Sequence, residues 1–231
     1  KLVFDFTGNV FKTGGVASTF SNSITHARAG HATMVDSDGL IKWAPHNFFL
    51  RSEDFTHSEW SDYAITAVSN ATTAPDGTLT AAKLIEDSGN FNRFVAQRKA
   101  DVGRTLAVFA KAAEWDHVSL IITDISGNHS AKTFNLTSGT LAGGVTYSTN
   151  ALVENPTITS VGDGWYLCTV DITKADNVLW TGIMPFNQFG DPINPSPALV
   201  GDGTSGIYVW GPHVYRSDLG GMVNNSATGN S

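Results

Sequence analysis

The feature that most constrains this chain is its hydrophobic pattern, which follows the two-residue period of strands and almost nowhere the period of helices. Short apolar segments recur about every 10 to 15 residues, with Gly, Asn, Asp or Pro between them. In "TLAVFAKAA", Leu106, Val108 and Ala110 share one face, whereas Phe109 and Lys111 share the other. Strands of this kind bury one face against a second sheet. The pattern predicts an all-β fold, an antiparallel β-sandwich of the jelly-roll type.

The composition suits such a fold and narrows the partners. Only 15% of the 231 residues are charged and 23 are glycine, a mix that is typical of short strands joined by many turns. Nucleic acid is not expected as a partner, because phosphate binding needs clustered Lys and Arg, and the 14 basic residues are scattered in a chain of net charge −7. No apolar run approaches the ~20 residues of a membrane span, so membrane insertion is not expected either.

Three parts can be distinguished by composition. Residues 1–46 are predicted to be an extended N-terminal arm, rich in Gly, Ser and Thr, which ends in a β-hairpin around the turn "DSDG". Residues 47–216 are predicted to form the sandwich, and residues 217–231 a flexible tail or linker. The arm contains phenylalanines that are spaced too irregularly for one strand, as in a segment that orders on a partner. These candidates for docking are Phe4, Phe6, Phe11 and Phe20.

The stretch "NFFLRSEDFTHSEW", residues 47–60, is predicted to be the first strand of the sandwich and the turn after it. By alternation, Phe48 and Leu50 would face the core and Phe49 would face outward. Trp60 would close one end of the core or lie at its rim.

No pattern of a catalytic site stands out. Seven histidines are present, but none forms a pair with the i, i+4 spacing of a zinc protease, and no Cys/His cluster exists. A nucleophile elbow, a P-loop and a dinucleotide fingerprint are also absent. The single cysteine, Cys168, excludes an intrachain disulfide, which fits a reducing compartment, and it is expected to be a buried structural thiol. We therefore expect a protein that is not an enzyme.

Tryptophans are the candidates for glycan contact, because exposed aromatic rings stack on the apolar faces of sugars. Trp165 and Trp210 lie inside regular strands and are expected in the core. Trp60 in "HSEWSD" and Trp115 in "AAEWDH" have polar, turn-like surroundings and are the better candidates for exposure. Even for these two rings, anchoring in the core is the first expectation.

Three acidic residues are weak candidates for a metal site. Glu53 and Asp54 are neighbours on the predicted first strand, where they would point to opposite faces, so they cannot form a catalytic pair alone. Asp202 lies in the glycine turn "GDGTSG". Its simpler interpretation is a loop cap that accepts hydrogen bonds from nearby backbone N–H groups.

Several segments follow one another along the chain: "ATMVDSDGLIKWAPHN", "NFFLRSEDFTHSEWS", "TTAPDGTLTAAKLIED", "VGDGWYLCTVDIT" and "GDGTSGIYVWGPHV". In this order they resemble the segments of a recurrent domain in tailed-bacteriophage structural proteins, over about residues 30–215. The resemblance implies a jelly roll similar to the carbohydrate-binding modules of glycoside hydrolases. Those modules bind glycans through aromatic and polar side chains and often hold a structural calcium near their first and last strands. Glu53 and Asp54 occupy the matching first-strand positions, whereas the last strand, "YVWGPHV", lacks the acidic pair that many modules carry there.

The resemblance implies a function in a virion. The chain looks like a non-enzymatic component of a phage tail, fibre or capsid decoration that is assembled in the host cytoplasm and needs no cofactor beyond such a calcium. Its partners would be other virion proteins and host-surface glycan, for assembly, attachment or both. Fibre and decoration proteins are commonly trimeric, so the resemblance also implies a homo-oligomer. The alternative is a free-standing carbohydrate-binding module of a glycan-active protein.

Overall fold

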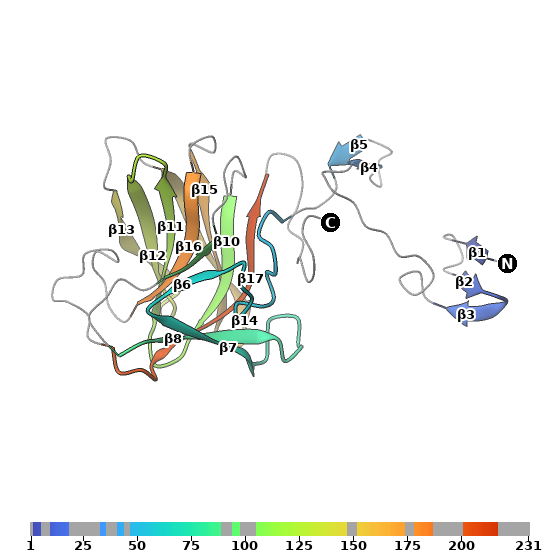
Figure 1. Cartoon of the computed structure of the whole chain (residues 1–231), viewed down its shortest axis with the longest axis horizontal. Helices are drawn as coiled ribbons and strands as arrows, with labels where there is room; N and C mark the ends of the chain where they lie inside the picture. The colour runs from blue at the N-terminus through green and yellow to red at the C-terminus, as the bar shows by residue number, and fades with distance from the viewer. Residues whose placement is uncertain are drawn as a thin grey trace. The chain divides into compact units, whose positions relative to one another are not determined.

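The computed structural model (Figure 1) describes residues 2–5, 10–18, 33–35, 41–43, 47–88, 94–97, 105–146, 152–173, 178–186 and 201–216. Contacts along the chain define two compact units, residues 1–30 and residues 31–231. All regular elements in the described ranges are β-strands, which confirms the predicted all-β class. No helix that could cross a membrane occurs among these residues.

The N-terminal unit contains a small antiparallel sheet that was not predicted. Its strands are β1 (Leu2–Asp5), β2 (Val10–Thr13) and β3 (Val16–Ser18), and they pair in the order β1–β2–β3. Gly14 and Gly15 connect β2 to β3 with φ angles of 62° and 87°. Residues with a Cβ rarely adopt such values, which explains why two glycines stand at this turn.

Two of the four phenylalanines proposed for docking lie in this sheet. Phe4 on β1 and Phe11 on β2 are direct register partners. Phe6 and Phe20 lie outside the described residues. The docking of these residues on a partner therefore stays a prediction.

The hairpin that was predicted at the end of the arm is present. Strand β4 (Thr33–Val35) pairs antiparallel with β5 (Ile41–Trp43). The predicted turn, residues 36–39, and the predicted tail, residues 217–231, lie outside the described ranges.

The larger unit contains two antiparallel sheets of six strands each, consistent with the predicted β-sandwich. Sheet I has the order β14 (Val153–Gly162), β15 (Trp165–Ile172), β10 (Thr105–Ala112), β17 (Gly206–Tyr215), β8 (Ala81–Glu86) and β7 (Ile65–Thr72). Sheet II has the order β13 (Thr140–Thr146), β12 (His129–Asn135), β11 (His117–Asp124), β16 (Val178–Phe186), β9 (Phe94–Gln97) and β6 (Ser61–Tyr63).

Each of the last two strands is inserted between earlier strands of one sheet. Strand β17 lies between β8 and β10 in sheet I, and β16 lies between β9 and β11 in sheet II. The chain also passes repeatedly from one sheet to the other, for example between β10 and β11 and between β15 and β16. Neither sheet is complete until the C-terminal strands have joined it, so most pairings close long loops and folding is expected to be slow.

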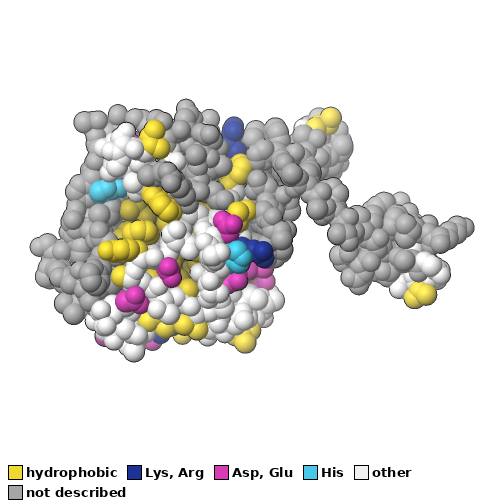
Figure 2. Space-filling model, in the orientation of Figure 1, with side chains coloured by type: hydrophobic (Ala, Val, Ile, Leu, Met, Phe, Trp, Pro, Cys, Tyr) yellow, Lys and Arg dark blue, Asp and Glu magenta, His cyan; other side chains and the backbone are white. Residues whose placement is uncertain are grey.

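The surface reflects the acidic composition of the chain, which has 14 Lys and Arg against 21 Asp and Glu. Figure 2 shows acidic side chains scattered over the described part of the face that it displays. Such a surface repels polyanions in general. A site for an acidic ligand on this protein must therefore concentrate its own positive charge.

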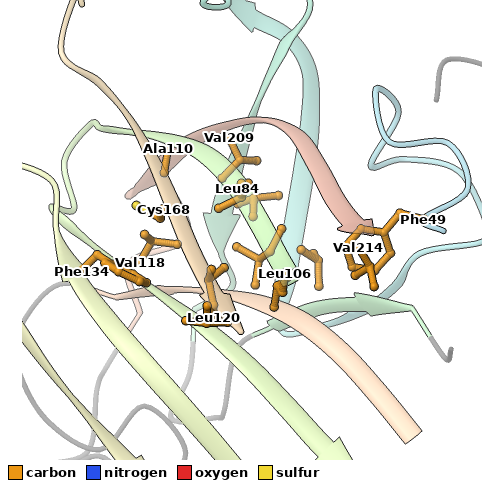
Figure 3. Close-up of a cluster of buried hydrophobic side chains, with 14 of the residues drawn as sticks. Phe49, Leu84, Leu106, Ala110, Val118, Leu120, Phe134, Cys168, Val209 and Val214 are labelled. Carbon is orange, nitrogen blue, oxygen red and sulfur yellow. The ribbon is translucent and has the colours of Figure 1, made fainter. Parts of the chain in front are cut away.

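The main core lies between the two sheets and is filled by alternate side chains of both (Figure 3). It includes, all fully buried, Leu84, Leu106, Val209, Val118, Leu120 and Phe134. Burial of one such side chain contributes roughly 1.5–3 kcal/mol. Cys168 also lies in this core, as predicted, and burial raises the pKa of its thiol far above the ordinary range.

The stretch predicted as the first sandwich strand does not form one. Phe48 and Phe49 are both buried, so the predicted alternation is wrong. Asn47 explains the difference: its Nδ2 donates to the Pro212 carbonyl at 2.9 Å, and its Oδ1 accepts from the N–H groups of Phe49 and Val214 at 3.0 and 3.2 Å. The Asn47 side chain thus adds bonds to β17 beside the backbone bond from the Phe48 N–H to the Val214 carbonyl, which is 2.8 Å long. Because this stretch is not an extended strand, its side chains do not alternate, and both phenylalanine rings pack in the core.

Candidate functional site

The two tryptophans that were the better candidates for exposure are buried, each with 5% of its surface accessible. The Trp60 ring lies 4.9 Å from the Phe49 ring and 4.7 Å from the Phe55 ring, and its Nε1 donates to the Arg51 carbonyl at 2.9 Å. Trp115 also belongs to the main core. Both rings anchor the core, which was the first expectation for them, because the polar neighbours face solvent while the ring turns inward.

Two of the three acidic residues considered for a metal, Asp54 and Asp202, serve as turn caps. Asp54 Oδ1 accepts from the backbone N–H and the hydroxyl of Thr56 at 3.0 and 2.6 Å. Asp202 accepts from the hydroxyl and the backbone N–H of Ser205 at 2.6 and 2.7 Å, and these bonds hold the pKa of Asp202 well below its usual range. Glu53 is half-buried in the turn before β6. Within the described ranges, no group of three or more His, Cys, Asp or Glu side chains could hold a metal ion.

A second apolar cluster lies on the outer face of sheet I, on the opposite side from the main core. It is built around Trp165 on β15 and Trp210 on β17, which are both buried. The loop between β7 and β8 holds both indoles: Trp165 Nε1 donates to the Thr73 carbonyl at 3.2 Å, and Trp210 Nε1 donates to the Thr80 hydroxyl at 3.0 Å. These two rings are buried as the strand pattern predicts, but under a loop instead of between the sheets.

Two half-buried rings pack against this outer cluster. They are Phe109 on β10 and Tyr208 on β17. Phe109 and Trp210 are register partners, and their ring centroids lie 5.3 Å apart with the planes tilted by 58°. Tyr208 precedes Trp210 by two residues on the same strand and therefore lies on the same face. The outer face of sheet I thus offers aromatic surface that remains partly open to solvent.

Two half-buried lysines share this face with the rings. Lys111 on β10 is the register partner of both Tyr208 and Trp165, and Lys83 on β8 is the register partner of Tyr208. Lys83, Tyr208, Lys111 and Trp165 therefore form a row across four adjacent strands. Strands in a sheet are about 4.8 Å apart, so the row is roughly 14 Å long.

The two lysines differ in how their charge is used. Lys83 Nζ lies 2.7 Å from Glu114 Oε2 and donates to the Thr204 carbonyl at 3.2 Å. The hydrogen bond from Lys83 lowers the pKa of Glu114. In the part of the chain that the structure describes, Lys111 has no ion-pair partner, and its stem packs over Gly164. Lys111 is therefore the lysine of this row whose charge is available to a ligand.

We call this surface the aromatic–lysine patch, and it consists of Lys83, Phe109, Lys111, Trp165, Tyr208 and Trp210. Aromatic rings can stack on the apolar face of a sugar, and an ammonium group supplies three hydrogen-bond donors and a positive charge. The side chains of the patch lie on the central strands of sheet I, where the backbone holds them in fixed relative positions. The aromatic surface and the available ammonium can together bind a ligand.

The described histidine that most resembles a catalytic group is His117, on the outer face of sheet II. Its Nδ1 lies 2.6 Å from Asp116 Oδ1, and its Nε2 lies 3.1 Å from Asn135 Nδ2. Because the amide nitrogen can only donate, Nε2 accepts and Nδ1–H donates to the carboxylate. Both ring nitrogens are thus engaged within the fold, and neither is placed to take a proton from a substrate.

The sequence had placed Phe109 and Lys111 on one strand face and Tyr208 and Trp210 on another, but it did not single them out as a site. The missing information is the register that places β10 between β15 and β17. The sequence matches no family model and no curated protein sequence. The case for the site therefore rests on the geometry of the patch.

Proposed function

We propose that this chain is a non-enzymatic structural protein of a phage virion, a component of the tail, a fibre or the capsid decoration, whose sandwich is a jelly roll that contacts glycans. The strand order supports the jelly roll, because β16 and β17 each lie between two earlier strands of their sheet, as interlocking Greek keys require. Jelly rolls recur in viral capsid and lectin domains. The order of the sequence segments, which resembles that of tailed-phage structural proteins, points in the same direction.

The observation that carries the glycan part of the proposal is the aromatic–lysine patch. The rings of Phe109 and Tyr208 are partly exposed on the outer face of sheet I, and they pack against the cluster that contains the two buried tryptophans. Rings on a rigid support lose little conformational freedom when a sugar stacks on them. This arrangement supports a binding role for the carbohydrate-binding-like sandwich.

The chemical state of the reactive residues supports a non-enzymatic role. Asp54 and Asp202 cap their own turns, and both nitrogens of His117 are engaged by neighbouring side chains. The thiol of Cys168 is buried and its pKa is raised, so it is not ionised at neutral pH. Asp54, Asp202 and His117 are thus each engaged by a structural partner, and the Cys168 thiol is enclosed in the core.

The N-terminal unit supports a role in assembly. Its strands have four, four and three residues, and a segment of fewer than about 40 residues rarely buries enough apolar surface to be stable alone. Val16 on β3 is 71% exposed, so the sheet presents apolar surface. We infer that this unit docks on another virion protein. A homo-oligomer, commonly a trimer in fibres and decoration proteins, is part of the same proposal.

The test of the virion role is immunogold labelling of intact particles with an antibody against this chain. Label at a defined place on the head or tail is the expected result. Absence of label, with the protein found free, would favour the second candidate, a free-standing carbohydrate-binding module of a glycan-active protein, which the aromatic–lysine patch also suits. Particles that still incorporate a chain lacking residues 1–30 would refute docking through the N-terminal unit.

A further inference from the structure

We infer that the aromatic–lysine patch binds a saccharide that carries a carboxylate, with the acidic group paired to Lys111. This inference rests on the proposed glycan contact and names the class of glycan that the patch takes. Its basis is the row Lys83, Tyr208, Lys111 and Trp165, in which an available ammonium stands between two aromatic residues.

The position of Lys111 gives the ligand its geometry. Tyr208 on β17 and Trp165 on β15 are its cross-strand partners, and Phe109 lies two residues away on the same face of β10. Tyr208 lies one strand spacing (~4.8 Å) from Lys111, and Phe109 lies two residue rises (~7 Å) from it. A sugar ring that stacks on either aromatic ring can therefore bring a carboxylate to Lys111. The same binding event uses the apolar face of the sugar and its charge.

The charge distribution favours an acidic ligand at this point over a neutral one. Glu114 already neutralises Lys83 through a 2.7 Å ion pair, whereas no carboxylate among the described residues pairs with Lys111. The chain as a whole has a formal net charge of −7. Lys111 is a half-buried cation that lacks a counter-ion among the described residues. An ion pair with an anionic ligand is favourable at such a site, because the partly apolar surroundings strengthen the attraction.

The structural alternative is that Lys111 only covers the outer cluster with its aliphatic stem, which packs over Gly164. Lys111→Met keeps an apolar stem of similar length and removes the charge, while Lys111→Arg keeps the charge. Lys132→Met is the control for the loss of a half-buried strand lysine elsewhere, because Lys132 lies on β12 in sheet II as the register partner of Leu120. A purely structural Lys111 predicts no difference between acidic and neutral ligands in any of these proteins.

The experiment measures retention of the full chain in affinity gels that contain polygalacturonate, alginate or hyaluronate, each paired with its carboxyl-reduced, neutral form. We expect binding to at least one acidic polymer, and affinity lower by roughly tenfold for its reduced form. Lys111→Met should lose about the same factor on the acidic polymer and nothing on the reduced one. Lys111→Arg and Lys132→Met should behave like the wild type.

The outcomes separate this inference from the proposed function. Equal retention in acidic and reduced gels, or an unchanged Lys111→Met variant, would overturn the acidic specificity and leave glycan binding intact. Retention in none of the gels would overturn the inference and also count against the glycan part of the proposed function. Circular dichroism of each variant checks that the fold is retained.

Discussion

The outer faces of the two sheets differ although the same strand alternation produces both. On sheet I, the residues that point away from the core include Phe109, Lys111 and Tyr208, and a loop covers the tryptophans beside them. On sheet II, the centre of the outer face has short side chains such as Ser119 and Thr133, whose hydroxyl oxygens lie 2.7 Å apart. The inward residues specify the sandwich in both sheets. The outward residues are not needed for that core, so they are where a binding function can differ.

Each outer face also contains a pair of aromatic rings, and the two pairs are held differently. Tyr63 and Phe94 stack at the β6 edge of sheet II, with centroids 5.7 Å apart and planes 16° from parallel, and Tyr63 is 51% exposed. Phe109 and Tyr208 lie on central strands of sheet I beside lysines. A cross-strand pair on a three-residue edge strand mainly fixes the register of that strand. Exposure alone therefore does not identify a binding surface.

The largest effect expected is on stability, from Trp165→Ala in the outer cluster of sheet I. Trp165 is buried and its indole donates to the Thr73 carbonyl, so its removal leaves a cavity and an unpaired acceptor. We expect a loss of about 3–5 kcal/mol, as for a buried tryptophan in a main core. Urea unfolding measures it. The matched variant Tyr63→Ala, on the outer face of sheet II, should lose less than about 1 kcal/mol. Equal losses would show that the two outer faces do not differ in this way.

A smaller effect is expected on ligand affinity. Tyr208→Ala should weaken glycan binding about tenfold, because stacking of an aromatic ring is worth roughly 0.5–1.5 kcal/mol. Tyr63→Ala should leave affinity unchanged. Isothermal titration with the oligosaccharide that the affinity gels identify measures both. The reverse result, with Tyr63 required and Tyr208 dispensable, would move the binding site to the edge of sheet II.

The local sequence pattern predicted which side chains of a strand face the core, but it did not predict which strands pair with one another. Alternation correctly separated Phe109 and Lys111 from the core residues on β10, because that property depends only on sequence spacing. The pairing of Lys111 with Tyr208 joins residues far apart in the chain, and no short window contains that information. The place of Asn47 was misjudged for a related reason: the bonding of its side chain to distant backbone decided it.

The two lysines of the patch offer a finer comparison within one face. Glu114→Gln would remove the charge that neutralises Lys83 and place a second available ammonium beside Tyr208. We expect affinity for an acidic oligosaccharide to rise by a factor of about two to five, since exposed charge pairs are worth up to about 1 kcal/mol. Affinity for the carboxyl-reduced form should not change. A variant with lower affinity for the acidic form would mean that Glu114 contacts the ligand or orders the site.

The smallest effect expected is the pH dependence of the Lys83–Glu114 pair. The hydrogen bond from Lys83 lowers the pKa of Glu114, so the folded state binds this proton less readily than the unfolded state. The pair therefore stabilises the fold fully above the ordinary Glu pKa of about 4.3, and its contribution is lost as the pH falls through the lowered value. The Glu114 side chain is 53% exposed, so solvent screening keeps the contribution below about 1 kcal/mol. Urea unfolding of wild type and Glu114→Gln should differ at pH 7 and converge as the pH falls below the lowered pKa of Glu114. A difference that persists at low pH would show that Glu114 acts through its packing or its bond to the Gly206 N–H instead of its charge.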